Sequence, residues 1–192
     1  MMNGYYTPEE LESLGLASYG TNVLISRKSS IYGASRIYIG SNVRIDDFCV
    51  LSAGSGGIYI HSYIHIGVYS SLIGEGKIVL GDYCNISSKV AIYSSNDDYS
   101  GEYMTNPLIP SRYSNVTCGN VIIGKHVIIG TNATILPEVV LSDGVCIGAY
   151  SLVKDNCEEF YVYVGIPAKK IKSRGKGLLN REKQFVADIK II

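Results

Sequence analysis

The chain has 192 residues, of which 46% are hydrophobic and 18% are charged, and its 17 basic and 17 acidic residues give a formal net charge of zero. This composition is typical of one globular domain and excludes a disordered chain, while the balanced charge gives no indication of nucleic acid as a partner. The first residues lack the basic and apolar segments of a signal peptide, and no run of about 18 apolar residues occurs, so we expect a cytoplasmic protein without a transmembrane segment.

A short helix is predicted near the N-terminus. Thr7 can serve as its N-cap, Pro8 suits the first helical position, and Glu10 stands three residues after the cap, which is the pattern of a capping box. The helix should end near Gly15 and cover one end of the core, because the terminal turn of a repeat fold otherwise exposes apolar surface. We assign residues 1–36 to this helix and to irregular strands that follow it.

Through most of the remaining chain an aliphatic residue returns every six positions. The longest run consists of Ile123, Ile129, Ile135, Leu141, Ile147 and Val153, and the same spacing joins Ile39, Ile45 and Leu51, then Ile60, Ile66 and Leu72, then Leu80, Ile86 and Ile92. A period of six arises when short strands meet at tight corners, three to a turn, so that each aliphatic side chain points to the axis of a triangular prism. We therefore predict an all-β fold, a parallel β-helix of about five triangular coils over residues 37–174.

Two segments interrupt or follow the repeat. The spacing stops after Ile92 and resumes at Ile123, which predicts a long loop over residues 94–119, after the third coil. Polar loops of this length in a compact domain are usually functional. Residues 175–192 are predicted to form a C-terminal helix that begins at about Leu178 and has one apolar side.

Three segments near the end of the repeat resemble a known family. IGKHVIIGTNA (123–133) and IGAYSLVK (147–154) are similar to the hexapeptide-repeat acyltransferases, and VGIPAK (164–169) is similar to the G-[IVN]-P-A-[RK] signature that ends their repeat. Within that superfamily, the galactoside and maltose acetyltransferase branch and the sugar acetyltransferases of bacterial surface-polysaccharide synthesis are the most similar. The resemblance covers about residues 37–174. It implies that the β-helix is left-handed and that the protein is a homotrimer with active sites in the clefts between chains.

The resemblance also implies where acetyl-CoA, the acyl donor, would bind. By position, the residues lining the pantetheine arm would be Thr131, Ala133, Ala149 and Lys154, and those facing the nucleotide phosphates would be Lys169 and Lys172. Small residues at a corner let the thin pantetheine approach the backbone, and ammonium groups neutralise phosphate. Without the preceding GIPA segment, the two lysines would be read as a solvated basic tail. No metal is expected.

The catalytic base is the point at which the sequence departs from the family. The family places a histidine at the start of the long loop, but IYSSND (92–97) puts Asp97 there. Aspartate, with an ordinary pKa of about 3.9, is a weaker base than histidine at about 6.5. His65 is the second candidate: His65 and Asn85 each precede an inward isoleucine, so they should be neighbours in adjacent coils about 4.8 Å apart. They could orient the acceptor, act as base and oxyanion donor, or form a polar ladder facing solvent.

The sequence therefore predicts an acetyl-CoA-dependent acetyltransferase that acts on a hydroxyl or amino group of a sugar or sugar nucleotide, for bacterial surface-polysaccharide or O-antigen synthesis. Transfer would be direct, because no cysteine stands in the context of a nucleophile. An amine that has lost its ammonium proton is already nucleophilic, so Asp97 as sole base favours an amino-sugar acceptor, whereas His65 as base leaves a hydroxyl acceptor open.

Two other functions are compatible with the fold. A non-catalytic β-helix scaffold or adaptor is the first, although the intact GIPA segment is unfavourable to it. A zinc-dependent hydratase of the same fold is the second. It requires three histidines that meet across a subunit boundary, with two of them spaced H-x4-H, whereas His61 and His65 are spaced H-x3-H and His126 is distant.

Overall fold

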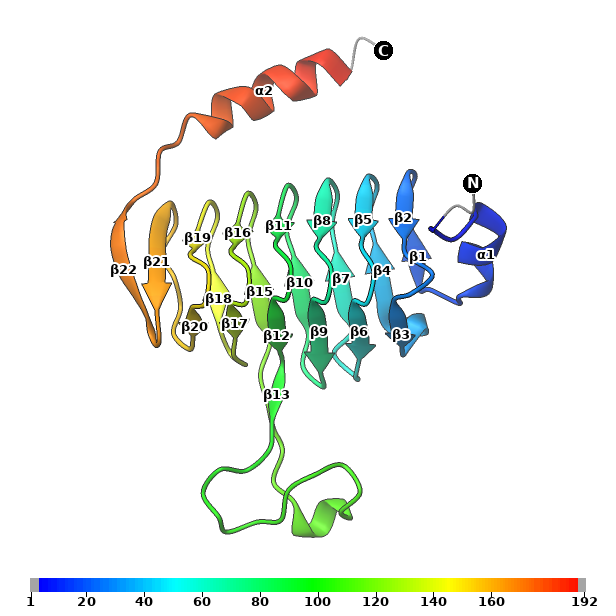
Figure 1. Ribbon diagram of the computed structural model, residues 1–192, viewed down its shortest axis with the longest axis vertical. Helices are drawn as coiled ribbons and strands as arrows, with labels where there is room; N and C mark the ends of the chain where they lie inside the picture. The colour runs from blue at the N-terminus through cyan, green and yellow to red at the C-terminus, as the bar shows by residue number, and fades with distance from the viewer. Residues whose placement is uncertain (1–3, 190–192) are drawn as a thin grey trace.

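The computed structural model describes residues 4–189, in which short parallel strands stack into three flat sheets that form the faces of a triangular prism (Figure 1). The chain visits the three sheets in turn, so strands from successive coils lie side by side in each sheet. The fold is the predicted left-handed parallel β-helix with a helix at each end.

Within each sheet the strands follow one another along the prism axis. The first sheet contains β1 (Ser18–Tyr19), β4 (Ile37–Ile39), β7 (Ile58–Ile60), β10 (Ile78–Leu80), β15 (Val121–Ile123) and β18 (Val140–Leu141). The second contains β2 (Val23–Ile25), β5 (Val43–Ile45), β8 (Ile64–Ile66), β11 (Asn85–Ile86), β16 (Ile128–Ile129), β19 (Cys146–Ile147), β21 (Tyr161–Gly165) and β22 (Ala168–Ser173). The third contains β3 (Ser30–Tyr32), β6 (Val50–Ala53), β9 (Ser71–Gly74), β12 (Ala91–Tyr93), β17 (Thr134–Ile135) and β20 (Leu152–Val153).

The β-helix begins one coil earlier than the sequence count of about five indicated. Strands β1, β2 and β3 pair in parallel with β4, β5 and β6, so the segment expected to hold irregular strands forms a regular coil. Its residues Tyr19, Ile25 and Ile31 keep the six-residue spacing, but the first is not aliphatic. The short 3₁₀ helix η1 (Ala34–Arg36) then shifts the spacing before the next coil, which concealed the repeat.

The core consists of one column of aliphatic side chains. Every residue of the six-residue runs identified in the sequence is at most 3% exposed, and most are fully buried. Along the three-residue strands the pattern is buried, outward, buried, as the alternation of side chains in a strand requires. Because these side chains fill the interior, binding sites must lie on the outer faces and at the corners of the prism.

Each coil turns at three corners, which position the candidate sites. The first corner, between the first and second sheets, has turn residues with positive φ at Asn22, Asn42, Tyr63, Tyr83 and His126. The second corner, between the second and third sheets, has them at Phe48, Tyr69, Lys89, Asn132 and Tyr150. The third corner leads from the third sheet to the next coil and carries the glycine-rich segments 54–57 and 74–76. A Cβ on Gly54 would lie only 2.5 Å from the Cα of Glu75, so the stacking of coils at this corner requires glycine.

The predicted long loop forms an arm that projects from the prism after β12 (Figure 1). Its neck is the antiparallel pair β13 (Ser95–Asn96) and β14 (Thr117–Cys118), and the distal part contains the 3₁₀ helix η2 (Ser111–Tyr113). Ser94 fastens the neck to the prism, because its hydroxyl donates to the Gly76 carbonyl at 2.7 Å and its own carbonyl accepts from the N–H of Gly119.

The two helices also agree with the sequence. Helix α1 (Pro8–Ser13) has the predicted capping box, in which Thr7 N–H donates to the Glu10 carboxylate at 2.7 Å, and it buries Leu11 against the first coil. Helix α2 (Leu178–Ile189) lies over the first corner, where the ring of Phe185 meets that of Tyr63 edge to face at 5.2 Å. Neither helix has the length and apolar character needed to cross a membrane, as far as residues 4–189 are concerned.

Candidate active site

Asp97 is the first residue beyond the neck of the arm, and its side chain is exposed. It lines a groove of about 620 Å³, which we call the third-corner groove. Besides Asp97, its walls include Tyr32, Arg36 and Glu75 from the third corner of the N-terminal coils, and Pro107 and Val116 from the arm. The neighbouring Asp98 is hydrogen bonded within the arm, where its carboxylate accepts from the Ser100 hydroxyl at 2.8 Å. This hydrogen bond lowers the pKa of Asp98.

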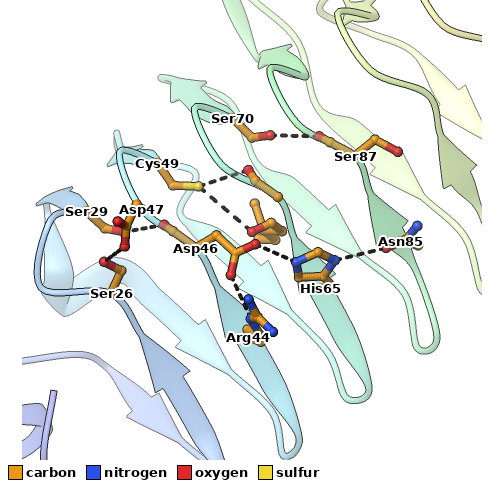
Figure 2. A network of polar contacts seen from close by, with 12 residues as sticks. Ser26, Ser29, Arg44, Asp46, Asp47, Cys49, His65, Ser70, Asn85 and Ser87 are labelled. Atoms are coloured by element: carbon orange, nitrogen blue, oxygen red, sulfur yellow. Dashed lines mark hydrogen bonds and ion pairs between the residues drawn. The ribbon is translucent and has the colours of Figure 1, made fainter. Parts of the chain in front are cut away.

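His65 and Asn85 are neighbours on the outer face of the second sheet, as the sequence predicted. The register of β5, β8 and β11 aligns Arg44, His65 and Asn85 in one row. His65 Nδ1 lies 3.2 Å from Asn85 Oδ1, and His65 Nε2 lies 2.8 Å from Asp46 Oδ2 (Figure 2). Because the Asp46 carboxylate can only accept, Nε2–H of His65 donates to it, and Nδ1 either accepts from the Asn85 amide nitrogen or, when the ring is protonated, donates to Asn85 Oδ1.

Asp46 completes a row that we call the second-sheet ladder, composed of Arg44, Asp46, His65 and Asn85. Its second carboxylate oxygen accepts from Arg44 Nε at 2.7 Å, and its side chain is only 12% exposed. The adjacent Asp47 turns away from His65 and accepts a hydrogen bond from the Ser26 hydroxyl (Figure 2). Asp47 also pairs with Lys28 at 2.8 Å, and this hydrogen bond lowers the pKa of Asp47. The two aspartates therefore serve separate networks.

Two of the residues predicted to line the pantetheine arm lie at the second corner of the C-terminal coils, whereas Lys154 directly follows β20 and lies at the third corner. Thr131 and the exposed Ala149 stand at the second corner in adjacent coils, and the Thr131 hydroxyl donates to the Ser88 carbonyl at 2.7 Å. Lys154 is exposed and lies 3.9 Å from Asp155. Ala133 differs: its side chain is fully buried in the core, so it has no surface to offer a ligand. Alanine is small enough for pantetheine to approach the backbone closely, but the alternation of side chains turns Ala133 toward the core.

The basic residues predicted to meet phosphate lie on the hairpin of β21 and β22. Lys169 and Lys172 are exposed on β22, opposite Val164 and Val162. In the described part of the chain neither has a carboxylate within ion-pair distance, whereas the adjacent Lys170 pairs with Glu158 at 2.8 Å. Two uncompensated ammonium groups at the end of the prism suit an anionic ligand.

The single chain brings His65 and Asn85 together but keeps Asp97 apart from them. Asp97 belongs to the third-corner groove, whereas His65 and Asn85 face outward from the second sheet. Thr131 and Ala149 stand at the second corner, so the third sheet separates them from the groove. Within the single chain, Asp97 therefore does not meet Thr131 or Ala149.

Sequence reasoning missed Tyr32, Arg36 and Glu75 of the groove and Asp46 of the ladder. Arg36 and Glu75 line the groove, and the glycine-rich corner segments beside them were the available signal. Asp46 lies one residue beyond β5. Its partnership with His65 follows from strand alternation, because Asp46 is two residues beyond Arg44, which pairs with His65.

The remaining histidines do not form a metal site. His126 Nε2 lies 2.8 Å from the Glu182 carboxylate of α2, and His61 lies beside a shallow surface pocket on the first sheet. Across residues 4–189 no three His, Cys, Asp or Glu side chains are grouped so as to hold a metal ion.

Comparison with known proteins identifies similar acyltransferases. No protein-family model matches the chain. It is 59% identical over 181 residues to a dTDP-4-amino-4,6-dideoxy-D-glucose acyltransferase of Escherichia coli, covering 94% of each protein. It is 30% identical over 150 residues, 77% of this chain and 74% of the relative, to WbbJ of Escherichia coli (strain K12), provisionally described as a lipopolysaccharide biosynthesis O-acetyl transferase.

A solved structure agrees over nearly the whole chain. AntD, an N-acyltransferase from Bacillus cereus, superposes with a TM-score of 0.93 at 46% identity, covering 97% of this chain and 100% of AntD, in a complex with dTDP-4-amino-4,6-dideoxyglucose and coenzyme A. Another AntD complex holds dTDP and 3-hydroxybutyryl-CoA. The AntD structures include variants at one serine and at one aspartate, which stand ten residues apart in that protein.

Proposed function

Because the chain belongs to the hexapeptide-repeat sugar acyltransferases and is therefore an acyl-CoA-dependent enzyme, we propose that it transfers an acetyl group to the amine of a dTDP-linked amino-dideoxyhexose. The same membership leaves no support for the alternative of a non-catalytic scaffold. An amino sugar acetylated while attached to its nucleotide is a unit for building surface polysaccharide, in line with the relatives that act on dTDP-amino sugars and on lipopolysaccharide.

The main support for an amine acceptor is a difference between the two candidate bases in how far their side chains are already hydrogen bonded. Asp97 is exposed in a groove, whereas both ring nitrogens of His65 are already hydrogen bonded. A base needs a lone pair that the acceptor can reach, and of the two side chains Asp97 is the one whose carboxylate has no hydrogen bond among the described residues, which supports its role as base. In this chain Ser87 and Asp97 stand ten residues apart, the same separation as the serine and aspartate replaced in the AntD variants, which supports a role for both.

The reaction needs one proton removal and one acyl transfer. The neutral amine attacks the thioester carbonyl, the C–N bond forms, and the tetrahedral intermediate collapses with cleavage of the C–S bond to release the CoA thiolate. Asp97 accepts the proton that the nitrogen loses, and the thiolate takes up a proton on leaving. The amine attacks the thioester directly, so the reaction needs no covalent enzyme intermediate. Burial raises the pKa of the Cys84 thiol to about 12, which makes that thiol a poor nucleophile.

We propose further that the active unit is a homotrimer. Asp97 at the third-corner groove and Thr131 and Ala149 at the second corner flank the same sheet, so a rotationally related chain can bring one chain's second corner to the next chain's groove. Acetyl-CoA would then run along the second corner toward Lys169 and Lys172. Thr131 and Ala149 would border its pantetheine arm, whereas Lys154, which follows β20, would reach it only from the other side of the third sheet.

Two experiments test these proposals. Release of free CoA from acetyl-CoA should depend on a dTDP-4-amino sugar and should be absent with the corresponding 4-hydroxy sugar nucleotide; equal release with both would refute the amine acceptor. For the shared site, chains carrying Asp97→Asn and chains carrying Lys169→Ala with Lys172→Ala should be mixed under conditions that allow subunit exchange. At acetyl-CoA concentrations well below KM, where the lysine variant is also slow, mixed trimers should be more active than either variant alone. Exchanged trimers that show no such gain would place the whole site in one chain.

A further inference from the structure

We propose that the third-corner groove holds the nucleoside diphosphate of the acceptor, with Arg36 at the diphosphate and Tyr32 against the pyrimidine ring. This inference rests on the proposed function, because it takes the acceptor to be an amino sugar attached to a pyrimidine nucleotide.

The groove has the dimensions of such a ligand. Its volume of about 620 Å³ lies within the range of small-molecule sites, which is roughly 300 to 1,000 Å³. It runs along the prism axis: Arg36 donates to Gly54 of the next coil, Gly54 N–H donates to Gly74 at 3.0 Å, and Glu75 N–H donates to Ser95 at 3.3 Å. Arg36 and the neck are thus about three coils apart, or roughly 14 Å at the spacing of adjacent strands.

Arg36 is held ready to bind an anion. Its Nε donates to the Gly54 carbonyl at 2.8 Å, and its Nη2 donates to the Ala53 carbonyl at 2.6 Å. These carbonyls fix the plane of the guanidinium but do not neutralise its charge, and within residues 4–189 no carboxylate lies within ion-pair distance of it. By contrast, Arg27 and Arg44 are paired with Glu10 and Asp46. A pre-oriented, uncompensated guanidinium is the side chain best suited to a diphosphate.

Tyr32 lies four residues before Arg36 and lines the same groove. Its side chain is 60% exposed, which leaves a ring face open to solvent. Stacking of a base on an aromatic side chain is worth about 1 to 3 kcal/mol and requires only an accessible face. Gly33, with φ of 68°, turns the backbone between Tyr32 and η1 so that both side chains reach the groove.

The charges along the groove determine the direction of the ligand. Arg36 is the cation among its lining residues, whereas Glu75 and Asp97 contribute carboxylates. A diphosphate between Glu75 and Asp97 would be repelled by both, but an ammonium group arriving at Asp97 would be attracted. The favoured order along the groove is therefore amine at Asp97, hexose hydroxyls at Glu75, diphosphate at Arg36 and pyrimidine at Tyr32.

The test is calorimetric binding of dTDP alone to the full-length chain and to four variants. Arg36→Ala should weaken the Kd for dTDP about tenfold or more, the size expected for a lost charged hydrogen bond. Tyr32→Ala should weaken it about fivefold or more, and Tyr32→Phe, which keeps the ring, should stay within about twofold. Lys77→Ala is the matched control: Lys77 also stands at the third corner, but its ammonium packs on Tyr59 of the first sheet, 5.2 Å from the ring centre. Binding of acetyl-CoA should be unchanged in all four.

The outcomes separate this inference from the proposed function. Unchanged dTDP binding in Tyr32→Ala and in a folded Arg36→Ala would overturn the groove assignment, even if the wild-type chain acetylates dTDP-amino sugars. If Arg36→Ala does not fold, because its bonds to Ala53 and Gly54 are lost, the exposed Tyr32 decides the question. If no dTDP-amine is acetylated, the proposed function fails, while loss of dTDP binding in the variants would still support the groove.

Discussion

The third-corner groove and the second-sheet ladder both present acidic and basic side chains on the surface of one prism. They differ in whether those side chains already have hydrogen-bond or ion-pair partners within the protein. In the ladder, His65 is bonded at both nitrogens and Asp46 at both oxygens. In the groove, Asp97 is exposed and Arg36 has no counter-ion among the described residues. Histidine is the stronger base of the two candidates, but a base whose lone pairs are occupied cannot accept a proton from a substrate.

The difference follows from how each region is built. Ladder residues come from three adjacent strands in register, so their spacing of about 4.8 Å brings complementary polar groups into contact. Groove residues come from corners and from the start of the arm, where the backbone diverges and side chains do not meet. Contact within the sheet stabilises the fold, and lack of contact at the corner leaves groups free to bind a ligand.

The largest expected effect is a loss of turnover when Asp97 in the groove is replaced. Asp97→Asn should lower kcat by about a hundredfold or more, because the amide retains the shape of the side chain but cannot take the proton from the attacking amine. Steady-state turnover at saturating acetyl-CoA measures this, with calorimetric binding of acetyl-CoA as the check that the fold is intact. A decrease of less than about fivefold would remove Asp97 from the role of base.

The next largest effect is a change in KM for acetyl-CoA alone, which distinguishes the donor site from the acceptor groove. Replacing Lys169 and Lys172 together by Ala should raise KM for acetyl-CoA about tenfold and leave KM for the acceptor nearly unchanged, because the two ammonium groups would face only the CoA phosphates. Lys170→Ala is the control, since Lys170 is already paired with Glu158. A parallel rise in both KM values would instead indicate a general loss of stability.

A smaller effect is expected on the ladder side. His65→Ala should change kcat by less than about threefold and lower the free energy of unfolding by about 1 to 2 kcal/mol, the net value of one or two hydrogen bonds. Urea unfolding and turnover on the same preparation give both numbers. If the variant lost activity a hundredfold at unchanged stability, the ladder would have to be assigned to the active site.

The smallest effect concerns the third histidine, His126, whose partner Glu182 lies on α2. The His126 hydrogen bond lowers the pKa of Glu182, so this carboxylate stabilises the docked helix above its ordinary pKa of 4.5 and ceases to do so as the pH falls through the lowered value. Glu182→Gln should therefore cost about 0.5 kcal/mol at pH 7 and nothing at low pH. Thermal unfolding of both proteins across this range measures it; a constant difference at all pH values would contradict the assignment.

Much of the architecture was predictable because one physical requirement repeats along the chain. The six-residue spacing of Ile and Leu identified the coils, and the interruption between Ile92 and Ile123 located the arm. The family resemblance is confirmed by relatives that cover nearly the whole chain. The first coil was missed because Tyr19 breaks the aliphatic run, and Ala133 was misjudged because residue type does not reveal which way a side chain points.

The sequence by itself determined the period of the fold, the class of reaction and the departure from the family at Asp97, since each is carried by residues close together in the chain. Only the tertiary structure decided which of these groups are free. Asp46 meets His65 across 19 positions of sequence, and Tyr32 and Arg36 line a groove with Asp97 more than 60 positions away. Such contacts depend on the stacking of coils, which sets the distance between side chains without leaving a local pattern in the sequence.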